Sequence, residues 1–269
     1  MNLQIELTNQ CNLKCIECPN HLMQRERQHM SEEVLEKIVM EYIIGNNIGT
    51  IIVHKDGEPL LHPKFKQFIS RIAGVTDAKI DVYTNGFLLD HDKFEFLASI
   101  KNKVQFLVSF HKYNFDGKEN VYTDVWLDLE WMINQNKPNI EFVFVTHDTD
   151  LTTKEGLDNW MKVWRDMQKT HSNVAGVYVN QAINGWAGKV KSKGLSTFVS
   201  CPYGDGEHFF IGNTGNVVPC CMDLEEEIVL GNIMIDSREQ IIENRKVFYS
   251  GLNKEENLLP LCKRCLNGR

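Results

Sequence analysis

The sequence predicts an α/β fold in which a partial six-stranded (β/α)6 barrel precedes a small C-terminal domain. Six short apolar segments alternate with amphipathic ones over the first part of the chain, and each βαβ repeat takes about 30 residues. Six repeats fall short of the roughly 250 residues of a closed eight-fold barrel. The cysteines form two widely separated groups. We therefore expect domains at 1–190 and 191–269. A doubly wound open sheet has the same periodicity and remains an alternative.

The expected strands are rich in β-branched and aromatic residues. They lie at residues 3–8, 50–55, 79–85, 104–111, 140–147 and 176–183. The expected helices repeat their apolar residues every three or four positions. They lie at residues 31–44, 62–73, 90–101, 121–135 and 152–170. In the C-terminal part, apolar runs flank a Gly- and Asn-rich turn in "HFFIGNTGNVVPC" (208–220), which predicts a β-hairpin.

Charge and hydropathy exclude several classes of protein. The 269 residues carry a formal net charge of −7, and the Lys and Arg residues are scattered, which argues against nucleic acid as a partner. The densest charge run, "DLEEE" (223–227), is acidic. No apolar run reaches the roughly 18 residues of a membrane span, and the N-terminus lacks the features of a signal peptide. We expect a cytoplasmic protein that acts on a small-molecule substrate without a membrane partner.

Three cysteines are spaced C-x3-C-x2-C in "TNQCNLKCIECPN" (8–20), at Cys11, Cys15 and Cys18. In a reducing compartment, clustered cysteines indicate metal ligands. Three thiolates leave one iron of a 4Fe–4S cluster without a protein ligand, and an open metal position is a place for substrate. The alternative is a structural zinc ion with His21 as the fourth ligand. Because the loop follows the first expected strand, it lies at the strand ends where parallel α/β folds bind ligands.

This spacing, ahead of a six-fold β/α chain, resembles the radical S-adenosylmethionine (SAM) superfamily over nearly the whole sequence. The resemblance implies that the three cysteines hold a 4Fe–4S cluster whose fourth iron binds SAM. It also implies cleavage of SAM to a 5′-deoxyadenosyl radical, with an electron from an external donor such as flavodoxin or ferredoxin. "KDGEPLLHP" (55–63), "YTNG" (83–86) and "VSFHK" (108–112) resemble the SAM-binding strand ends of that family. The residues so implicated are Gly57, Glu58, Pro59, Thr84, Asn85 and Ser109.

The second cysteine group runs C-x13-G-x4-C between Cys201 and Cys220 and ends in C-x2-C at Cys262 and Cys265. It resembles the auxiliary-cluster extension of radical SAM maturases and dehydrogenases, in the shortened, SPASM-like form called a twitch domain, a β-hairpin plus helix. The resemblance implies a second 4Fe–4S cluster on these four cysteines. Two alternatives remain: a structural zinc ion at the same site, and Cys221 in place of Cys220 as the ligand.

Four thiolates leave an auxiliary cluster no free position for substrate, so its use would be electron transfer. That favours two-electron oxidation, and the layout resembles twitch enzymes of the 2-deoxy-scyllo-inosamine dehydrogenase type, which oxidise a secondary alcohol of an aminocyclitol. We expect a radical SAM oxidoreductase that dehydrogenates a small polar metabolite such as a sugar or aminocyclitol. The alternatives are a peptide maturase that forms a crosslink or epimer, radical rearrangement of a nucleotide or modified base, and a metal-stapled binding protein without catalysis.

Oxidation of an alcohol needs a base beside the reacting carbon. The predicted catalytic residues are His111 and Tyr178, in the fourth and sixth expected strands. Asn180 in the sixth strand is a predicted SAM-binding residue. Further polar or aromatic candidates for the base, for orientation or for contact with SAM are His54, Lys55, Asn184 and Trp186.

Overall fold

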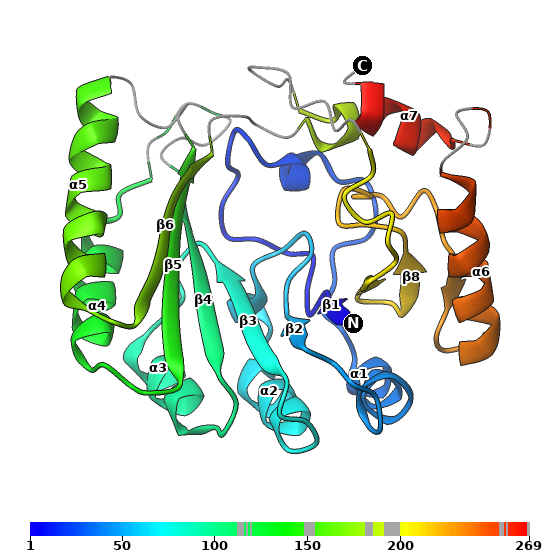
Figure 1. Ribbon diagram of the computed structural model, residues 1–269, viewed down its shortest axis with the longest axis horizontal. Helices are drawn as coiled ribbons and strands as arrows, with labels where there is room; N and C mark the ends of the chain where they lie inside the picture. Colours follow the sequence, from blue (N-terminus) through cyan, green and yellow to red (C-terminus); the bar gives the residue numbers. More distant parts are fainter. Residues whose placement is uncertain are drawn as a thin grey trace.

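The computed structural model describes residues 1–111, 116, 118, 120–147, 154–180, 185–190, 200–252, 256 and 258–267. Six strands follow one another in space as they do along the chain, and each pairs in parallel with the next. They are β1 (Asn2–Ile5), β2 (Thr50–Ile52), β3 (Lys79–Thr84), β4 (Val104–Phe110), β5 (Ile140–His147) and β6 (Val174–Asn180). This curved, open sheet confirms the predicted partial barrel (Figure 1).

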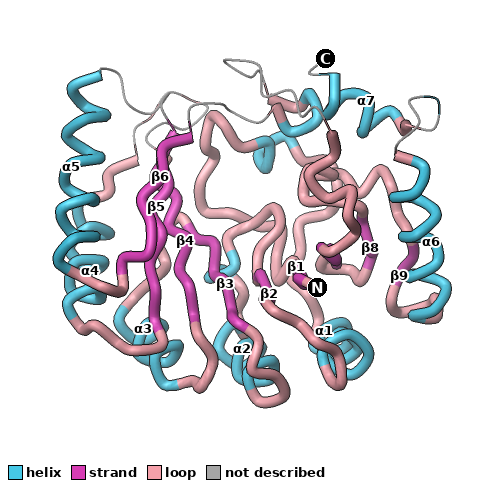
Figure 2. The backbone as a smooth tube through the Cα atoms, viewed as in Figure 1, coloured by secondary structure: helices cyan, strands magenta, loops and turns pink. Residues whose placement is uncertain are grey.

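The connecting helices lie along the outer face of the sheet (Figure 2). They are α1 (Glu32–Ile38) with a π-helical continuation (Val39–Ile43), α2 (Phe65–Ala73), α3 (His91–Ser99), α4 (Thr123–Asn134) and α5 (Lys154–Thr170). β1 and β2 are shorter than predicted, because the chain leaves the sheet after them to form loops that carry polar residues. Among the described residues, no helix has the length and apolarity needed to cross a bilayer.

The C-terminal part extends the same sheet. The predicted hairpin forms from β7 (His208–Ile211) and β8 (Asn216–Val218), and β9 (Gly231–Asn232) follows, before α6 (Arg238–Gly251) and α7 (Pro260–Asn267). β7 pairs in parallel with β1, so the described part of the chain forms a nine-stranded sheet with both ends open. The division at 190/191 remains a prediction, since residues 191–199 lie outside the described ranges.

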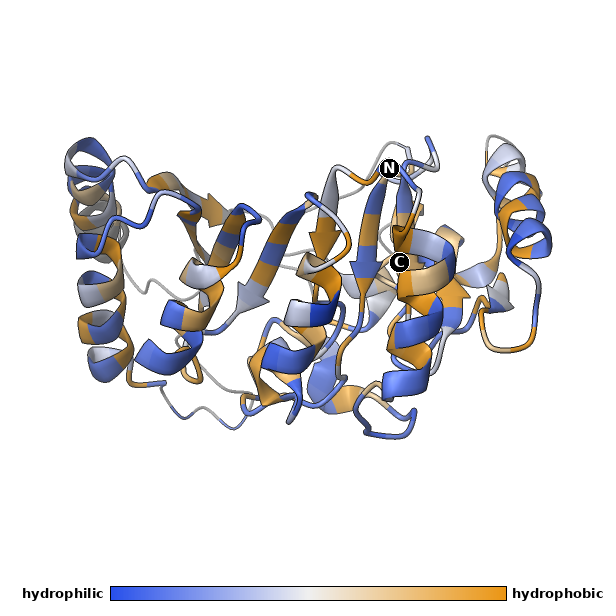
Figure 3. Ribbon diagram, turned by 90° about the horizontal axis from the view of Figure 1, so that it is seen from below, coloured by the Kyte–Doolittle hydropathy of each residue, from blue (hydrophilic) through white to orange (hydrophobic). Residues whose placement is uncertain are grey.

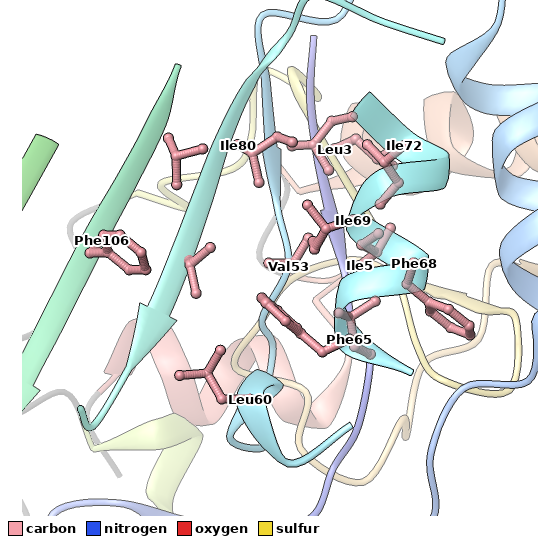
Figure 4. Close-up of a cluster of buried hydrophobic side chains, with 14 of the residues drawn as sticks. Leu3, Ile5, Val53, Leu60, Phe65, Phe68, Ile69, Ile72, Ile80 and Phe106 are labelled. Carbon is pink, nitrogen blue, oxygen red and sulfur yellow. The ribbon is translucent and has the colours of Figure 1, made fainter. Parts of the chain in front are cut away.

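Apolar and polar side chains alternate along the strands, as the bands in Figure 3 show. One face packs on the helices. Figure 4 shows this core, where Leu3 and Ile5 of β1 lie close to Phe65 and Ile69 of α2. Burying each such side chain contributes about 1.5–3 kcal/mol. The alternate positions, including Gln4, face the concave side of the sheet. The apolar core therefore lies on the outer, helix-covered face of the sheet, and polar side chains lie on the inner, concave face.

A buried ionic network joins the two halves of the chain. The Arg25 guanidinium contacts Glu6 at 2.6 Å, Asp56 at 2.8 Å and Glu226 at 3.1 Å, and these three carboxylate side chains are 0%, 1% and 7% exposed. Burial raises the pKa of Glu6, but Lys55 and Arg25 outweigh that effect and hold its pKa below the ordinary value. Arg25 thus neutralises carboxylates from three separate segments.

The acidic run 223–227 binds groups of this protein instead of forming a charged surface patch. The Glu225 carboxylate accepts hydrogen bonds from the backbone N–H groups of Gln24, at 3.0 and 3.2 Å, and Arg25, at 3.1 Å. Glu227 accepts two hydrogen bonds from Arg264 in α7, at 2.8 and 2.9 Å. The run therefore connects the segment that follows the first cysteines to the end of the chain.

We predict that Arg25→Met lowers the free energy of unfolding by about 3–5 kcal/mol, because it leaves buried carboxylates without their cation. The matched control is Arg71→Met, which removes an ion pair to Glu36 whose side chains are 31% and 49% exposed, and should cost less than about 0.5 kcal/mol. Urea unfolding curves measure both changes. Equal losses in the two variants would show that the buried network contributes no more than a surface pair.

Candidate active site

A cavity of about 550 Å³ opens at the carboxyl ends of the strands. Cys11, Cys15 and Cys18 all line it, and so do residues at the ends of β2, β3 and β4. The loop after β1 and helix α7 lie at this same end of the sheet (Figure 1). A concave site of this volume at the strand ends is the usual place for ligands in parallel α/β folds. The predicted cluster cysteines and the predicted SAM-binding strand ends therefore share one cavity.

Side chains within and just after the cysteine loop donate hydrogen bonds that hold the loop in place. Asn20 donates to the carbonyls of Asn9, at 3.0 Å, and Asp56, at 2.5 Å. Arg27 donates to Asn9 O and Asn20 Oδ1, both at 2.8 Å. Within the loop, the backbone N–H of Cys18 donates to the Cys15 carbonyl at 3.1 Å. These contacts hold the backbone of the cysteine loop, and none of the eight cysteines, all of which are described, forms a disulfide.

Gly57 lets the loop after β2 touch the backbone just ahead of the cysteines. A Cβ atom at Gly57 would lie 2.3 Å from the Thr8 carbonyl oxygen and 2.6 Å from that of Gln10. The N–H of the next residue, Glu58, donates to the Gln10 carbonyl at 2.8 Å. Only glycine fits this approach, because side chains need more room than these distances leave. The absence of a side chain at Gly57 therefore allows the cysteine loop to pack against the loop that follows β2.

Glu58 joins the ends of β2 and β3. Its buried carboxylate accepts hydrogen bonds from Thr84 Oγ1 at 2.9 Å, Asn85 N at 2.9 Å and Leu60 N at 3.2 Å. Burial raises the pKa of Glu58 to about 7, although these donors oppose the rise. The Asn85 amide lies 4.0 Å from the Cys11 sulfur. Glu58, Thr84 and Asn85 thus form one unit beside the first cysteine, and Pro59 begins the short 3-10 turn that follows.

The other predicted site residues divide into two sets. Ser109 and His111 line the cavity, and His111 Nδ1 lies 3.4 Å from a Glu17 carboxylate oxygen. Trp186 also lines it. Tyr178 does not: its side chain is 57% exposed on β6, with the ring over Gly176.

Of three further candidates, Lys55 also lines the cavity, but its ammonium is bound within the protein. Lys55 is 1% exposed and its ammonium donates to Asp56 and, at 2.8 Å, to the Asp223 carbonyl. Two acceptors therefore engage Lys55 in the ionic network. The Asn180 side chain and Asn184 lie outside the described residues.

The C-terminal cysteines lie near one another. Burial, together with the neighbouring Cys201 and Cys265, raises the pKa of Cys262 to about 11. Burial raises the pKa of Cys220 strongly, with Cys221 and Cys265 adding to the effect. Thiolates this close repel one another, and a bound cationic centre removes that repulsion. The donor set therefore fits a metal or iron–sulfur centre.

Unlike the other C-terminal cysteines, Cys221 faces the central cavity. It lines this cavity, and its sulfur lies 3.1 Å from the hydroxyl oxygen of Tyr203.

Among the described residues, no group of three or more His, Cys, Asp or Glu side chains converges as a single metal ion requires. A single zinc ion needs its sulfurs within about 2.3 Å of one point, whereas each ligand of a 4Fe–4S cluster binds a different iron.

Several residues that line the cavity are absent from the site predicted from the polar strand ends. They are Gln4, Glu17, Tyr83, Tyr203, His208 and Met222. A signal for two of them was present: Gln4 alternates with Leu3 and Ile5, and Tyr83 follows Val82, so strand periodicity places both on the inner face. The residues that follow Cys201 reach the cavity only through the pairing of β7 with β1, which no local pattern indicates.

Comparison with known proteins agrees with this geometry. Residues 5–125 match the radical SAM superfamily, and residues 201–266 match the SPASM iron–sulfur cluster-binding domain. The S-adenosyl-L-methionine-dependent 2-deoxy-scyllo-inosamine dehydrogenase of Niallia circulans is 24% identical over 277 residues, covering 98% of this chain and 92% of that protein. The chain is therefore a radical SAM enzyme. It has a radical SAM domain followed by a SPASM domain, which implies iron–sulfur clusters and SAM binding.

Two solved structures share the fold. BtrN in complex with AdoMet and 2-DOIA superposes with a TM-score of 0.68 and 21% identity, covering 98% of this chain and 92% of that one. anSMEcpe with bound AdoMet and a peptide superposes with a TM-score of 0.60 and 19% identity, covering 100% of this chain and 90% of that one. At these identities the likeness establishes the fold and leaves the substrate to other arguments.

We predict that Gly57→Ala destabilises the protein by about 1–3 kcal/mol and lowers the iron retained after anaerobic reconstitution, because the new methyl group pushes the cysteine loop away from β2. Gly49→Ala is the control, since a Cβ there meets only Asn2 Oδ1 at 3.7 Å. Urea unfolding and iron analysis give the two readouts. Full iron retention in Gly57→Ala would mean that the contact with β2 is not needed to hold the loop.

Proposed function

We propose that this radical SAM enzyme dehydrogenates a secondary alcohol of a small polar metabolite, such as a sugar or aminocyclitol. One observation carries the proposal: a single cavity is lined by the three N-terminal cysteines and also by Cys221, which directly follows Cys220 of the C-terminal group. A substrate in this cavity lies between the two cysteine groups. The full-length similarity to a 2-deoxy-scyllo-inosamine dehydrogenase supports the same reaction class.

Two 4Fe–4S clusters are the proposed resident cofactors. Cys11, Cys15 and Cys18 would hold the SAM-binding cluster, and the auxiliary cluster would be held by Cys201, Cys220, Cys262 and Cys265. When bound, the first cluster supplies the electron that cleaves SAM to a 5′-deoxyadenosyl radical, and the second supplies an acceptor for the electron that the substrate gives up. An external donor such as flavodoxin or ferredoxin is the proposed electron source. Cys221 supports this ligand choice by facing the cavity.

The chain's own residues would position SAM and exclude water. Gly57 and the Glu58–Thr84–Asn85 unit form a hydrogen-bonded wall beside Cys11. Pro59, Ser109 and Asn180 complete the proposed set of SAM-binding residues. His111 lines the cavity beside Glu17, so it is retained as a substrate-side candidate, and Tyr178 is not retained because it lies away from the cavity.

We predict about eight irons per chain after anaerobic reconstitution, falling to about four in the Cys262→Ala/Cys265→Ala double variant. Cys221→Ala is the matched control and should retain about eight, because its sulfur faces the cavity. Iron, acid-labile sulfide and zinc analysis make the measurement. About four irons plus one zinc in the unaltered protein would replace the auxiliary cluster by a structural zinc site.

We predict that 2-deoxy-scyllo-inosamine, or a related alcohol carrying deuterium at the carbinol carbon, transfers that deuterium to 5′-deoxyadenosine and yields an equal amount of ketone. The physical reason is that hydrogen abstraction and electron loss act on the same carbon. Mass spectrometry of both products makes the measurement. SAM cleavage that leaves every tested alcohol unoxidised, with a peptide modified instead, would favour the maturase alternative.

A further inference from the structure

An imidazole and a phenol are stacked in the wall of the cavity. The rings of His54, just after β2, and Tyr83, in β3, have centroids 5.6 Å apart and an interplanar angle of 29°. Both residues line the cavity, and both follow core residues, Val53 and Val82, that face the helices. Strand alternation therefore directs this pair to the concave side of the sheet.

The side chains of this pair differ from those of their neighbours, because their polar atoms have no hydrogen-bond partner within the part of the chain that the structure describes. Thr84 and Asn85 are engaged by Glu58, and Lys55 is engaged by Asp56 and a backbone carbonyl. Among the described residues, none hydrogen-bonds the ring nitrogens of His54 or the hydroxyl of Tyr83, and none of these atoms is sealed from the cavity. Polar groups so placed are available to a ligand, because a buried polar group without a partner is costly.

Their protonation states suit a hydroxyl group. Burial lowers the pKa of His54 to about 4. The positive charge of Lys55 contributes to this decrease, and the negative charge of Glu6 opposes it. The imidazole is therefore neutral. Burial, together with the nearby Asp81 and Cys221, raises the pKa of Tyr83 to about 12, so the phenol keeps its proton. The pair thus offers one acceptor for a proton and one hydrogen-bond donor.

We propose that His54 and Tyr83 form the subsite for the reacting hydroxyl of a small alcohol such as a carbohydrate or cyclitol. Tyr83 donates a hydrogen bond to the hydroxyl oxygen, and a ring nitrogen of His54 receives its proton. This subsite rests on the proposed dehydrogenation. It lies between the unit that binds Cys11 and the side of the cavity that carries Cys221.

The carbinol carbon gives its hydrogen atom to the 5′-deoxyadenosyl group, which becomes 5′-deoxyadenosine. The hydroxyl proton passes to His54, one electron passes to an oxidised iron–sulfur centre, and the C–O single bond becomes C=O. Loss of the electron makes the hydroxyl strongly acidic, so an imidazole of low basicity accepts the proton.

The test compares reconstituted holoenzyme variants with 2-deoxy-scyllo-inosamine as the probe and measures ketone and 5′-deoxyadenosine separately. His54→Gln should keep 5′-deoxyadenosine formation while the ratio of ketone to 5′-deoxyadenosine falls about tenfold or more. Tyr83→Phe should weaken binding of the probe to the unreduced holoenzyme about three- to tenfold in calorimetry, since one hydrogen bond is lost. In His54→Ala, added imidazole should restore the ratio, which a structural defect would not allow.

Matched controls separate these effects from misfolding. Tyr42→Phe removes a buried hydroxyl that has no partner among the described residues, and His91→Gln changes a half-exposed histidine away from the cavity. Both should leave the ratio and the binding unchanged. If His54→Gln does not fold, His54→Asn takes its place.

The outcomes distinguish the subsite from the proposed function. A wild-type holoenzyme that oxidises no alcohol overturns the dehydrogenation and the subsite together. An active wild type whose ratio is unchanged in His54→Gln overturns the subsite alone. A fall in the ratio confined to His111→Asn would assign the proton to the His111–Glu17 side instead and would also overturn the subsite.

Discussion

Three buried carboxylates meet two cations where the cysteine loop, the ends of β1 and β2, and the acidic run come together. Arg25 and Lys55 form ion pairs with Glu6, Asp56 and Glu226, and each of these carboxylates comes from a different part of the chain. An unpaired charge at this depth costs several kcal/mol, so the network is stable only when all its segments are in place. The position of the N-terminal cysteines and of Cys221 around one cavity depends on this condition.

The cavity wall combines two kinds of polar group. On the side of the first cysteine, Glu58 binds Thr84 and Asn85, and these groups hold one another in place. On the side toward Cys221, the described part of the wall leaves the stacked His54 and Tyr83 rings without hydrogen bonds. Groups that are already satisfied give a rigid frame, whereas unsatisfied groups gain most from a ligand. The wall thus combines a rigid frame on one side with polar groups that can bind a ligand on the other.

Much of the fold could be predicted because local patterns determine it. The alternation of strands and helices and the hairpin around its Gly- and Asn-rich turn depend on side chains a few residues apart. The cavity was predictable in part: Ser109 and His111 line it as expected. Tyr178 lies on the same face of the sheet as Ser109 but does not line the cavity, and Lys55 is engaged by the buried network, since their surroundings are made by segments distant in the sequence.

The sequence by itself determined the two cysteine groups, the alternation of six strands with helices and the polar strand ends, because spacing and periodicity act within single segments. Only the tertiary structure decided that β7 lies beside β1 and that Cys221 faces the cavity. It alone decided that the acidic run binds Arg25 and Arg264. These contacts join residues far apart in the chain, and their partners are selected by packing and charge neutralisation across the whole fold.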